Sequence, residues 1–171
     1  IVKIPKLSDT DIENYLIDHS QLSETHATEY SFLADGNLIE AKALLQDTPN
    51  NNASQFTEWL RLGYGNKVPA MMDFTEDIAK WGRENQKNFL KYGINFLREC
   101  SLLLSGADDL VKLPNETLSV ALKLTTNVLN LAMVEALINE LEQAHYHIER
   151  NANPKILFLD VSLQIVKIIK F

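Results

Sequence analysis

The sequence predicts an all-α protein made of a small helical lobe followed by a larger helical bundle. With six glycines and five prolines in 171 residues, the chain has too few turn formers for a loop-rich β fold. Apolar residues recur mostly three and four positions apart, which is the period of a helix. One segment, residues 48–54, has a proline followed by residues that favour turns and helix caps, which is typical of a linker. We therefore expect one domain over residues 1–47 and a second over residues 55–171.

Three short helices are expected in the first domain. Ser8 precedes two carboxylates and an apolar set at helical spacing, so it should cap the first helix. Ser23 should open the second helix, and Gly36 should end it, because glycine readily adopts a positive φ. A third helix is expected from about Leu38 to Gln46. A bundle of this size is marginal alone.

Five or six helices, most of them antiparallel neighbours, are expected after the linker. Turn residues such as Gly106 and Pro114 separate their apolar stripes. One of these stripes consists of Leu118, Leu122, Thr125 and Leu129. Cys100 lies in another stripe and is interpreted as a small buried thiol rather than a nucleophile. A chain with one cysteine also fits a reducing compartment, so a cytoplasmic location is expected.

The final segment, residues 153–171, combines the features of a strand and of a helix. Apolar and polar residues alternate from Leu159 to Ile165, which is a strand period. The ends favour a helix, because Asn153 and Pro154 form a good N-cap and first-turn pair. As a helix, the segment is apolar on most sides and must be covered by its own bundle or by a partner chain.

The charge of the chain excludes several kinds of partner. The formal net charge is −7, which argues against independent binding to nucleic acid or to an anionic membrane surface. Most of the acidity lies in residues 1–47, which hold three lysines and nine acidic residues. We find no apolar run long enough to span a membrane and no signal peptide, so no membrane association is expected.

Motifs for catalysis or cofactor binding are absent from the sequence. We find no phosphate-binding loop, dinucleotide fingerprint or serine-nucleophile motif, and we expect neither a catalytic residue nor a cofactor. Glu142 and His145 have the Glu-x-x-His spacing of di-iron bundles, but there is no second copy of the motif. We therefore expect no metal site and interpret His145 as a core or interface histidine. Basic residues step along one helical face and are interpreted as solvated, with contact to a phosphate backbone as the alternative; they are Lys80, Arg83, Lys87 and Lys91.

Three stretches carry a resemblance through their order and spacing. They are residues 4–12 with Tyr30 and residues 33–41, then residues 82–92 with residues 96–99, and finally residues 150–159. Together they resemble the C-terminal part of the delta-prime subunits of the bacterial DNA polymerase III clamp loader. The resemblance covers the whole chain. It implies a three-helix lid of an AAA+ module followed by a collar domain.

The resemblance assigns a role to Ile39. In this family the Gly-Asn-Leu-x-x-Ala segment, here residues 36–41, contains the sensor-2 position, where the ATP-hydrolysing subunits place an arginine against the nucleotide phosphate. Isoleucine cannot donate a hydrogen bond to a phosphate. The resemblance therefore implies a non-hydrolysing subunit. Because the chain begins with Ile1 rather than methionine, we expect it to be a piece of a longer protein whose ATPase-like domain precedes it.

The function implied by the resemblance is scaffolding within the DNA polymerase III holoenzyme. The collar joins five subunits into a ring, and the lid transmits the orientation of the preceding domain. The expected partners are the delta subunit and the motor subunits of gamma or tau type, with the sliding clamp and primed DNA contacted only indirectly. The subunit interface is expected on the last helix, at Asn153, Pro154, Lys155, Leu159, Leu163 and Val166.

Two other functions compete with this interpretation. A helical transcription regulator would have a DNA-binding head followed by a ligand-binding bundle, and the length and order of the domains fit. Its head would be strongly acidic, with only Lys42 in the third helix, and would repel DNA phosphates. A ferritin-like metalloprotein is the second alternative, and it lacks most of its metal ligands.

Overall fold

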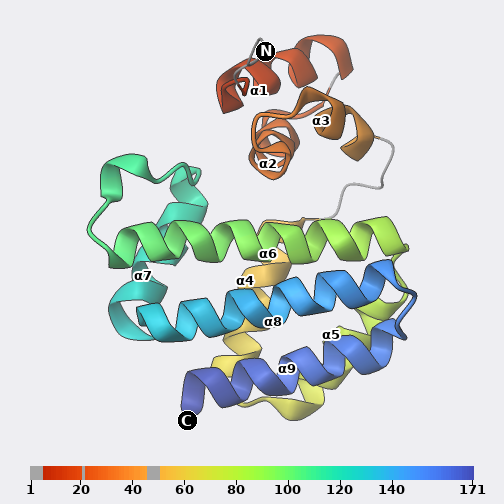
Figure 1. Cartoon of the computed structure of the whole chain (residues 1–171), viewed down its shortest axis with the longest axis vertical. Coiled ribbons are helices and arrows are strands. Elements are labelled where there is room, and N and C mark those ends of the chain that lie inside the picture. The colour runs from red at the N-terminus through yellow and green to blue at the C-terminus, as the bar shows by residue number, and fades with distance from the viewer. Residues whose placement is uncertain (1–5, 21, 46–50) are drawn as a thin grey trace, which may run out of the picture. The chain divides into compact units, whose positions relative to one another are not determined.

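The computed structural model describes residues 6–20, 22–45 and 51–171, and it divides into two compact units, Ile1–Asn50 and Asn51–Phe171 (Figure 1). Every regular element in the described residues is a helix, which confirms the predicted all-α class. The two units are described separately below.

The described part of the first unit contains three helices: α1 (Asp9–Ser20), α2 (Glu24–Ala34) and α3 (Leu38–Leu44). The predicted caps are confirmed, because Ser8 Oγ accepts a hydrogen bond from the Asp11 N–H at 3.1 Å and the Ser23 side chain caps α2. The C-cap of α2 is Asp35, with a φ of 43°, rather than the expected Gly36, which follows it with a φ of 81°. The small core of this unit consists of Ile12, Leu16, Ala27, Tyr30, Leu33, Ala34, Ala41 and Leu44.

Six α-helices and a short 3-10 helix form the second unit. They are α4 (Asn52–Tyr64), α5 (Val68–Ala79), α6 (Arg83–Leu104), η1 (Asp108–Leu110), α7 (Asn115–Asn127), α8 (Leu131–Glu149) and α9 (Pro154–Lys170). Helix α4 begins inside the segment expected to be the linker, residues 48–54, because Asn51 Oδ1 accepts a hydrogen bond from the Ser54 N–H at 3.2 Å. Residues 48–50 lie outside the described residues.

Helices α6, α8 and α9 lie side by side with α8 in the middle (Figure 1). Helix α4 crosses behind this layer and packs against α5, α6 and α9, while α5 packs along α9. Helix α7, which follows the 3-10 helix in the chain, packs against α6. This arrangement leaves α7 and α9 as outer elements of the bundle.

An aromatic cluster fills the centre of the second unit. Its fully buried members are Phe56, Trp59, Phe89, Phe96 and Phe158. The Phe56 ring meets those of Phe89 and Phe96 edge to face, at centroid distances of 6.0 and 5.7 Å. Edge-to-face contacts of this kind add to the large apolar area that each ring removes from water.

The last segment is helical, as the caps predicted. Asn153 Oδ1 accepts a hydrogen bond from the Ile156 N–H at 3.3 Å, and Pro154 occupies the first turn. The cap at Asn153 and Pro154 therefore indicates the structure of this segment correctly, and the strand-like alternation from Leu159 to Ile165 does not.

The stripe expected at residues 118–129 is covered only in part. Leu122 is 46% exposed, Leu118 and Thr125 are half-buried, and Ala121 is the buried residue of this helix. Leu129 is buried and lies beyond the end of the helix at Asn127. The period identifies a helix here, but it does not decide how far each member of the stripe is covered.

None of the described helices combines the length and the apolar character needed to cross a membrane.

Candidate functional site

Helix α9 has an inner face that belongs to the core. Its buried residues are Phe158, Val161, Ser162, Ile165 and Ile169. Ser162 Oγ accepts a hydrogen bond from Trp59 Nε1 at 2.7 Å and donates one to the Phe158 carbonyl at 2.7 Å. This face holds α9 on the bundle and is not available to a partner.

The outer face of α9 carries an apolar stripe, formed by Ile156, Leu159, Leu163 and Val166. The spacing of three, four and three residues places these side chains along one side of the helix. Ile156 is 69% exposed and Leu163 is 48% exposed, while Leu159 and Val166 are half-buried. We call these four residues the α9 stripe. The structure brings the predicted residues Leu159, Leu163 and Val166 together in it.

Ile156 was missed as a site residue by the sequence analysis. It is the most exposed member of the α9 stripe. The signal was present, because Ile156 lies three residues before Leu159 and so shares its side of a helix.

The beginning of α9 borders a shallow depression of about 430 Å³. It lies between the α5–α6 turn and the α8–α9 turn, and Asn153 and Pro154 form part of its wall. Trp81 and Arg83 contribute to the opposite side. The predicted residues Asn153 and Pro154 therefore lie at the N-terminal end of the α9 stripe, away from its middle.

Lys155 has an ion-pair partner within the second unit. Its Nζ lies 2.5 Å from Glu76 Oε1 on α5, and both side chains are about half exposed. The hydrogen bond and the positive charge of Lys155 lower the pKa of the Glu76 carboxyl. Because the pair is solvated, its contribution to stability is small. Lys155 ties α5 to α9, and its predicted role at a subunit interface stays a prediction.

The surroundings of the α9 stripe are apolar and basic. Helix α5 packs along α9 and exposes Val68 and Met72, one turn apart. At the other end, Lys167 and Lys170 are exposed, and Lys170 Nζ lies 4.5 Å from the centre of the Tyr64 ring. An apolar strip with positive charge at its end can bind an apolar surface that has an acidic border.

In the first unit, Ile39 lies in the first turn of α3 with its side chain 81% exposed. Its backbone N–H donates to Asn37 Oδ1 at 3.1 Å, so Asn37 caps this helix. An exposed aliphatic side chain at this position can make apolar contacts only.

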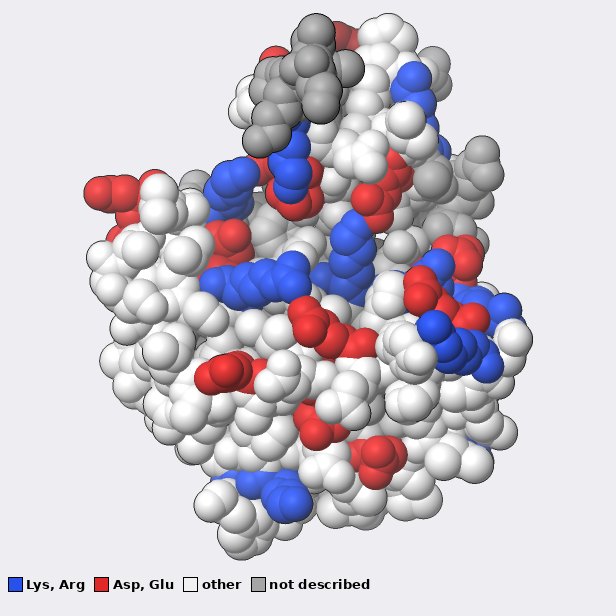
Figure 2. Space-filling model, viewed as in Figure 1, with Lys and Arg blue, Asp and Glu red and all other residues white. Residues whose placement is uncertain are grey.

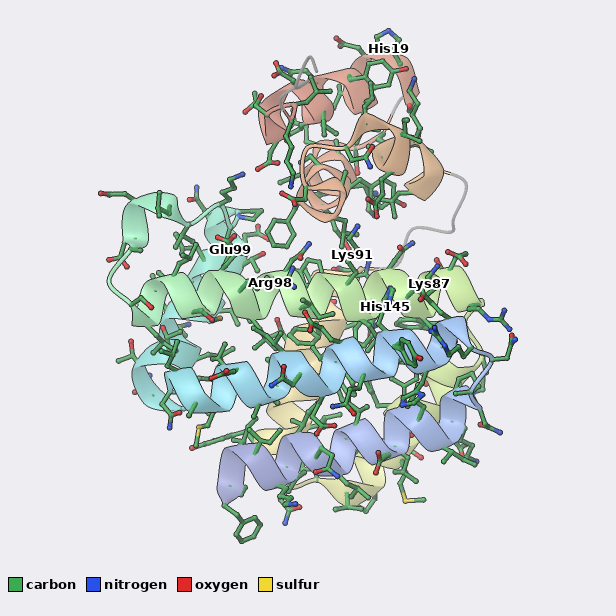
Figure 3. All side chains as sticks on the ribbon, in the orientation of Figure 1. His19, Lys87, Lys91, Arg98, Glu99 and His145 are labelled. Atoms are coloured by element: carbon green, nitrogen blue, oxygen red, sulfur yellow. The ribbon has the colours of Figure 1, made fainter. Side chains whose placement is uncertain are left out.

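Glu142 and His145 on α8 have different partners. The Glu142 carboxylate accepts a hydrogen bond from Arg98 Nη2 of α6 at 2.8 Å, while His145 Nδ1 lies 4.0 Å from Glu149. In Figure 3, His145 lies near the part of α6 that carries Lys87. Partial burial is the main cause of a lowered pKa of His145. Within the described ranges, no three His, Cys, Asp or Glu side chains are grouped to hold a metal ion.

The predicted basic stripe is divided by a turn. Lys80 is the C-cap of α5 and pairs with Asp77 at 2.7 Å, whereas Arg83 begins α6. Lys87 pairs with Glu84 at 3.1 Å. The prediction of one continuous face was wrong because Gly82 starts a new helix after Lys80.

Cys100 is fully buried on α6, as predicted. Burial, and to a lesser extent the charge of Glu99, raises the pKa of its thiol to about 12. The thiol is therefore protonated at neutral pH and is a poor nucleophile.

Comparison of the chain with protein-family models, with curated proteins and with solved structures finds no significant match.

Proposed function

We propose that this chain is the lid and collar part of a clamp-loader subunit of delta-prime type, and that it scaffolds the clamp-loader ring in the cytoplasm. The observation that carries the proposal is the α9 stripe. It exposes Ile156 and Leu163 on a helix whose other side is anchored in the core. A helix that serves only its own bundle has no need of such a stripe, because exposed apolar area of this kind favours association.

Other features of the chain support the same proposal. In the residues that the structure describes, the first unit has three helices, as an AAA+ lid requires, and the second has six α-helices. Ile39 stands at the sensor-2 position and cannot donate to a phosphate. The subunit would thus contribute contacts rather than hydrolysis, with the delta subunit and the motor subunits as its neighbours. The subunit would contact the sliding clamp and primed DNA only indirectly, through those neighbours.

The test is association with the collar of the motor subunit. The double variant Ile156→Asp with Leu163→Asp places two charges on the α9 stripe without entering the core. We expect an affinity loss of about 100-fold, or about 3 kcal/mol, because two apolar anchors are replaced by charges that must be desolvated. Isothermal titration calorimetry measures this loss.

A matched control is Leu7→Asp, which replaces an exposed leucine (44%) of the first unit by the same charge. The control should bind like the wild type. Unchanged affinity in the double variant, with the helical circular dichroism retained, would contradict the proposed role of α9.

A further inference from the structure

A shallow depression between two turns of the second unit is a candidate ligand site. Its volume of about 430 Å³ lies in the range of pockets that hold small organic molecules. One wall comes from the α5–α6 turn and the start of α6, and the other comes from the α8–α9 turn. We call it the turn depression, and the residues that line it include Trp81, Arg83, Gln86, Ile148 and Pro154.

Hydrogen bonds hold both walls of the turn depression in place. Gln86 Nε2 donates to the carbonyls of Ile78 and Trp81, at 3.1 and 3.0 Å, and so fixes the α5–α6 turn. In the other wall, the Ala152 N–H donates to the His147 carbonyl at 3.0 Å and closes the end of α8. A pocket whose walls are already ordered loses little freedom when a ligand binds.

Arg83 is a cation without an ion pair in the first wall. Figure 2 shows Lys and Arg side chains beside Asp and Glu at the right-hand end of the bundle, where the two turns lie in Figure 1. Asp77 lies 2.7 Å from Lys80, and Glu84 has its own partner in Lys87. Arg83 has no ion pair among the residues that the structure describes, so its guanidinium is available to bind an anion.

The start of α6 adds to this preference for an anion. Arg83 is the first residue of the helix, and the N-cap is Gly82, which has no side chain to cap it. The N–H groups of the first turn therefore lack a capping acceptor. The positive end of the helix dipole thus lies beside the guanidinium.

Gln86 supplies a hydrogen-bond acceptor in the same wall. It is 2% exposed and lines the turn depression, so the little surface that it keeps faces that space. Its Oε1 has no hydrogen-bond partner in the described part of the chain, whereas Nε2 is used by the α5–α6 turn. Because Gln86 lies one helical turn after Arg83, a ligand held by the guanidinium can donate to this oxygen.

Apolar side chains form much of the remaining lining. The half-buried ring of Trp81 is held by an edge-to-face contact with Phe89, at a centroid distance of 5.5 Å. Ile148 is buried and Pro154 is half-buried. This lining suits a ligand with an apolar body and one anionic group, since a polyanion requires more than one unpaired cation.

We infer that the turn depression binds an α-carboxylate that has a neighbouring amide N–H and an apolar side chain. The Arg83 guanidinium pairs with the carboxylate, Gln86 Oε1 accepts from the amide N–H, and Trp81 covers the side chain. Free N-acylated amino acids and the last residue of a peptide share this chemistry. The inference goes beyond the proposed function, because it depends on no contact between subunits.

The experiment adds N-acetyl-L-phenylalanine to the isotope-labelled full chain and follows binding by NMR spectroscopy. We expect a dissociation constant of about 1 mM, with shifts of the Trp81 indole N–H and of the Gln86 side-chain amide. Arg83→Gln should weaken binding at least tenfold, because it removes the charged donor. Arg61→Gln is the matched control at an exposed arginine of α4 that pairs with Glu58, and it should bind like the wild type.

Changes in the ligand test each contact without a change in the fold. The primary amide of the probe lacks the carboxylate and should bind at least tenfold more weakly. Phenylpropionate lacks the amide N–H and should bind several-fold more weakly. The tripeptide glycyl-glycyl-phenylalanine distinguishes the two sources: tighter binding than the acetylated amino acid indicates a peptide terminus, and weaker binding indicates a small molecule.

Three results would overturn the inference. They are the absence of shifts at the turn depression at ten times the expected dissociation constant, equal binding of the acid and its amide, and equal binding by the wild type and Arg83→Gln. None of them bears on the α9 stripe, whose test is association with the motor subunit.

Discussion

Gly93 lies on α6 against the ring of Phe56, at the centre of the aromatic cluster. A Cβ atom at this position would lie 2.4 Å from Phe56 Cε2 and 2.8 Å from Cζ. The ring cannot move aside easily, because Trp59 and Phe96 pack against it. The absence of a side chain at residue 93 therefore permits the close approach of α4 and α6.

Gly93→Ala should destabilise the protein despite the better helix propensity of alanine. Overpacking a core costs about 1–3 kcal/mol, and alanine recovers about 0.8–1 kcal/mol of helix propensity. We expect a net loss of about 1 kcal/mol in the free energy of unfolding, measured by urea denaturation.

The matched control for this prediction is the same change in a Phe56→Leu background. The smaller side chain leaves room for the new methyl group, so Gly93→Ala should cost less there or even stabilise the protein. Equal costs in both backgrounds would show that contact with Phe56 is not the cause.

At the scale of the element, α9 is positioned by a close crossing with α4. A Cβ atom on Gly63 would lie 2.6 Å from Ile165 Cγ2, so the glycine allows the two helices to approach. The buried hydrogen bond from Trp59 Nε1 to Ser162 Oγ spans the same pair of helices. Together these contacts determine which side of α9 remains outside.

Ser162→Ala should lower the free energy of unfolding by about 1–3 kcal/mol. The change removes the acceptor of the Trp59 N–H, and a buried donor without its partner carries the full desolvation cost. Urea denaturation followed by tryptophan fluorescence measures the loss.

Ser101→Ala on α6 is the control for the change at Ser162. Ser101 Oγ also donates to the carbonyl four residues earlier, at 3.2 Å from Leu97 O, without the tryptophan partner. Its replacement should change the free energy of unfolding by less than about 0.5 kcal/mol. A similar effect of both changes would argue against a special role for the Trp59 bond.

At the scale of the whole molecule, the two units differ in their ability to fold alone. The first unit is smaller than most independently stable domains, and its core is small. The second unit spans Asn51–Phe171 and contains the complete aromatic cluster. We therefore expect the folding of the second unit to be independent of the first unit.

The fragment 51–171 should fold without the rest of the chain. We expect helical circular dichroism and a cooperative urea transition at the midpoint of the main transition of the full chain. A fragment 55–171, which starts at the predicted domain boundary, should unfold about 1 kcal/mol more easily, because it lacks the Asn51 cap and the first turn of α4. A fragment 51–171 without a cooperative transition would contradict this independence.

The local features of the sequence were sufficient for the class of fold and for most helix ends. Ser8, Ser23 and Asn153 cap helices as predicted, because capping depends on a few neighbouring residues. The same reasoning resolved the ambiguous last segment in favour of a helix.

By itself, the sequence determined that this protein is helical, where several of its helix caps fall, and that its last helix is too apolar to stand alone. The tertiary structure decided which apolar side chains stay outside, since this depends on contacts between distant segments. Ser162 is buried because α4 brings Trp59 to it, and Leu122 is exposed because α7 meets the bundle around Ala121. Periodicity identifies a helix, but only the packing of other helices against it decides which face remains for a partner.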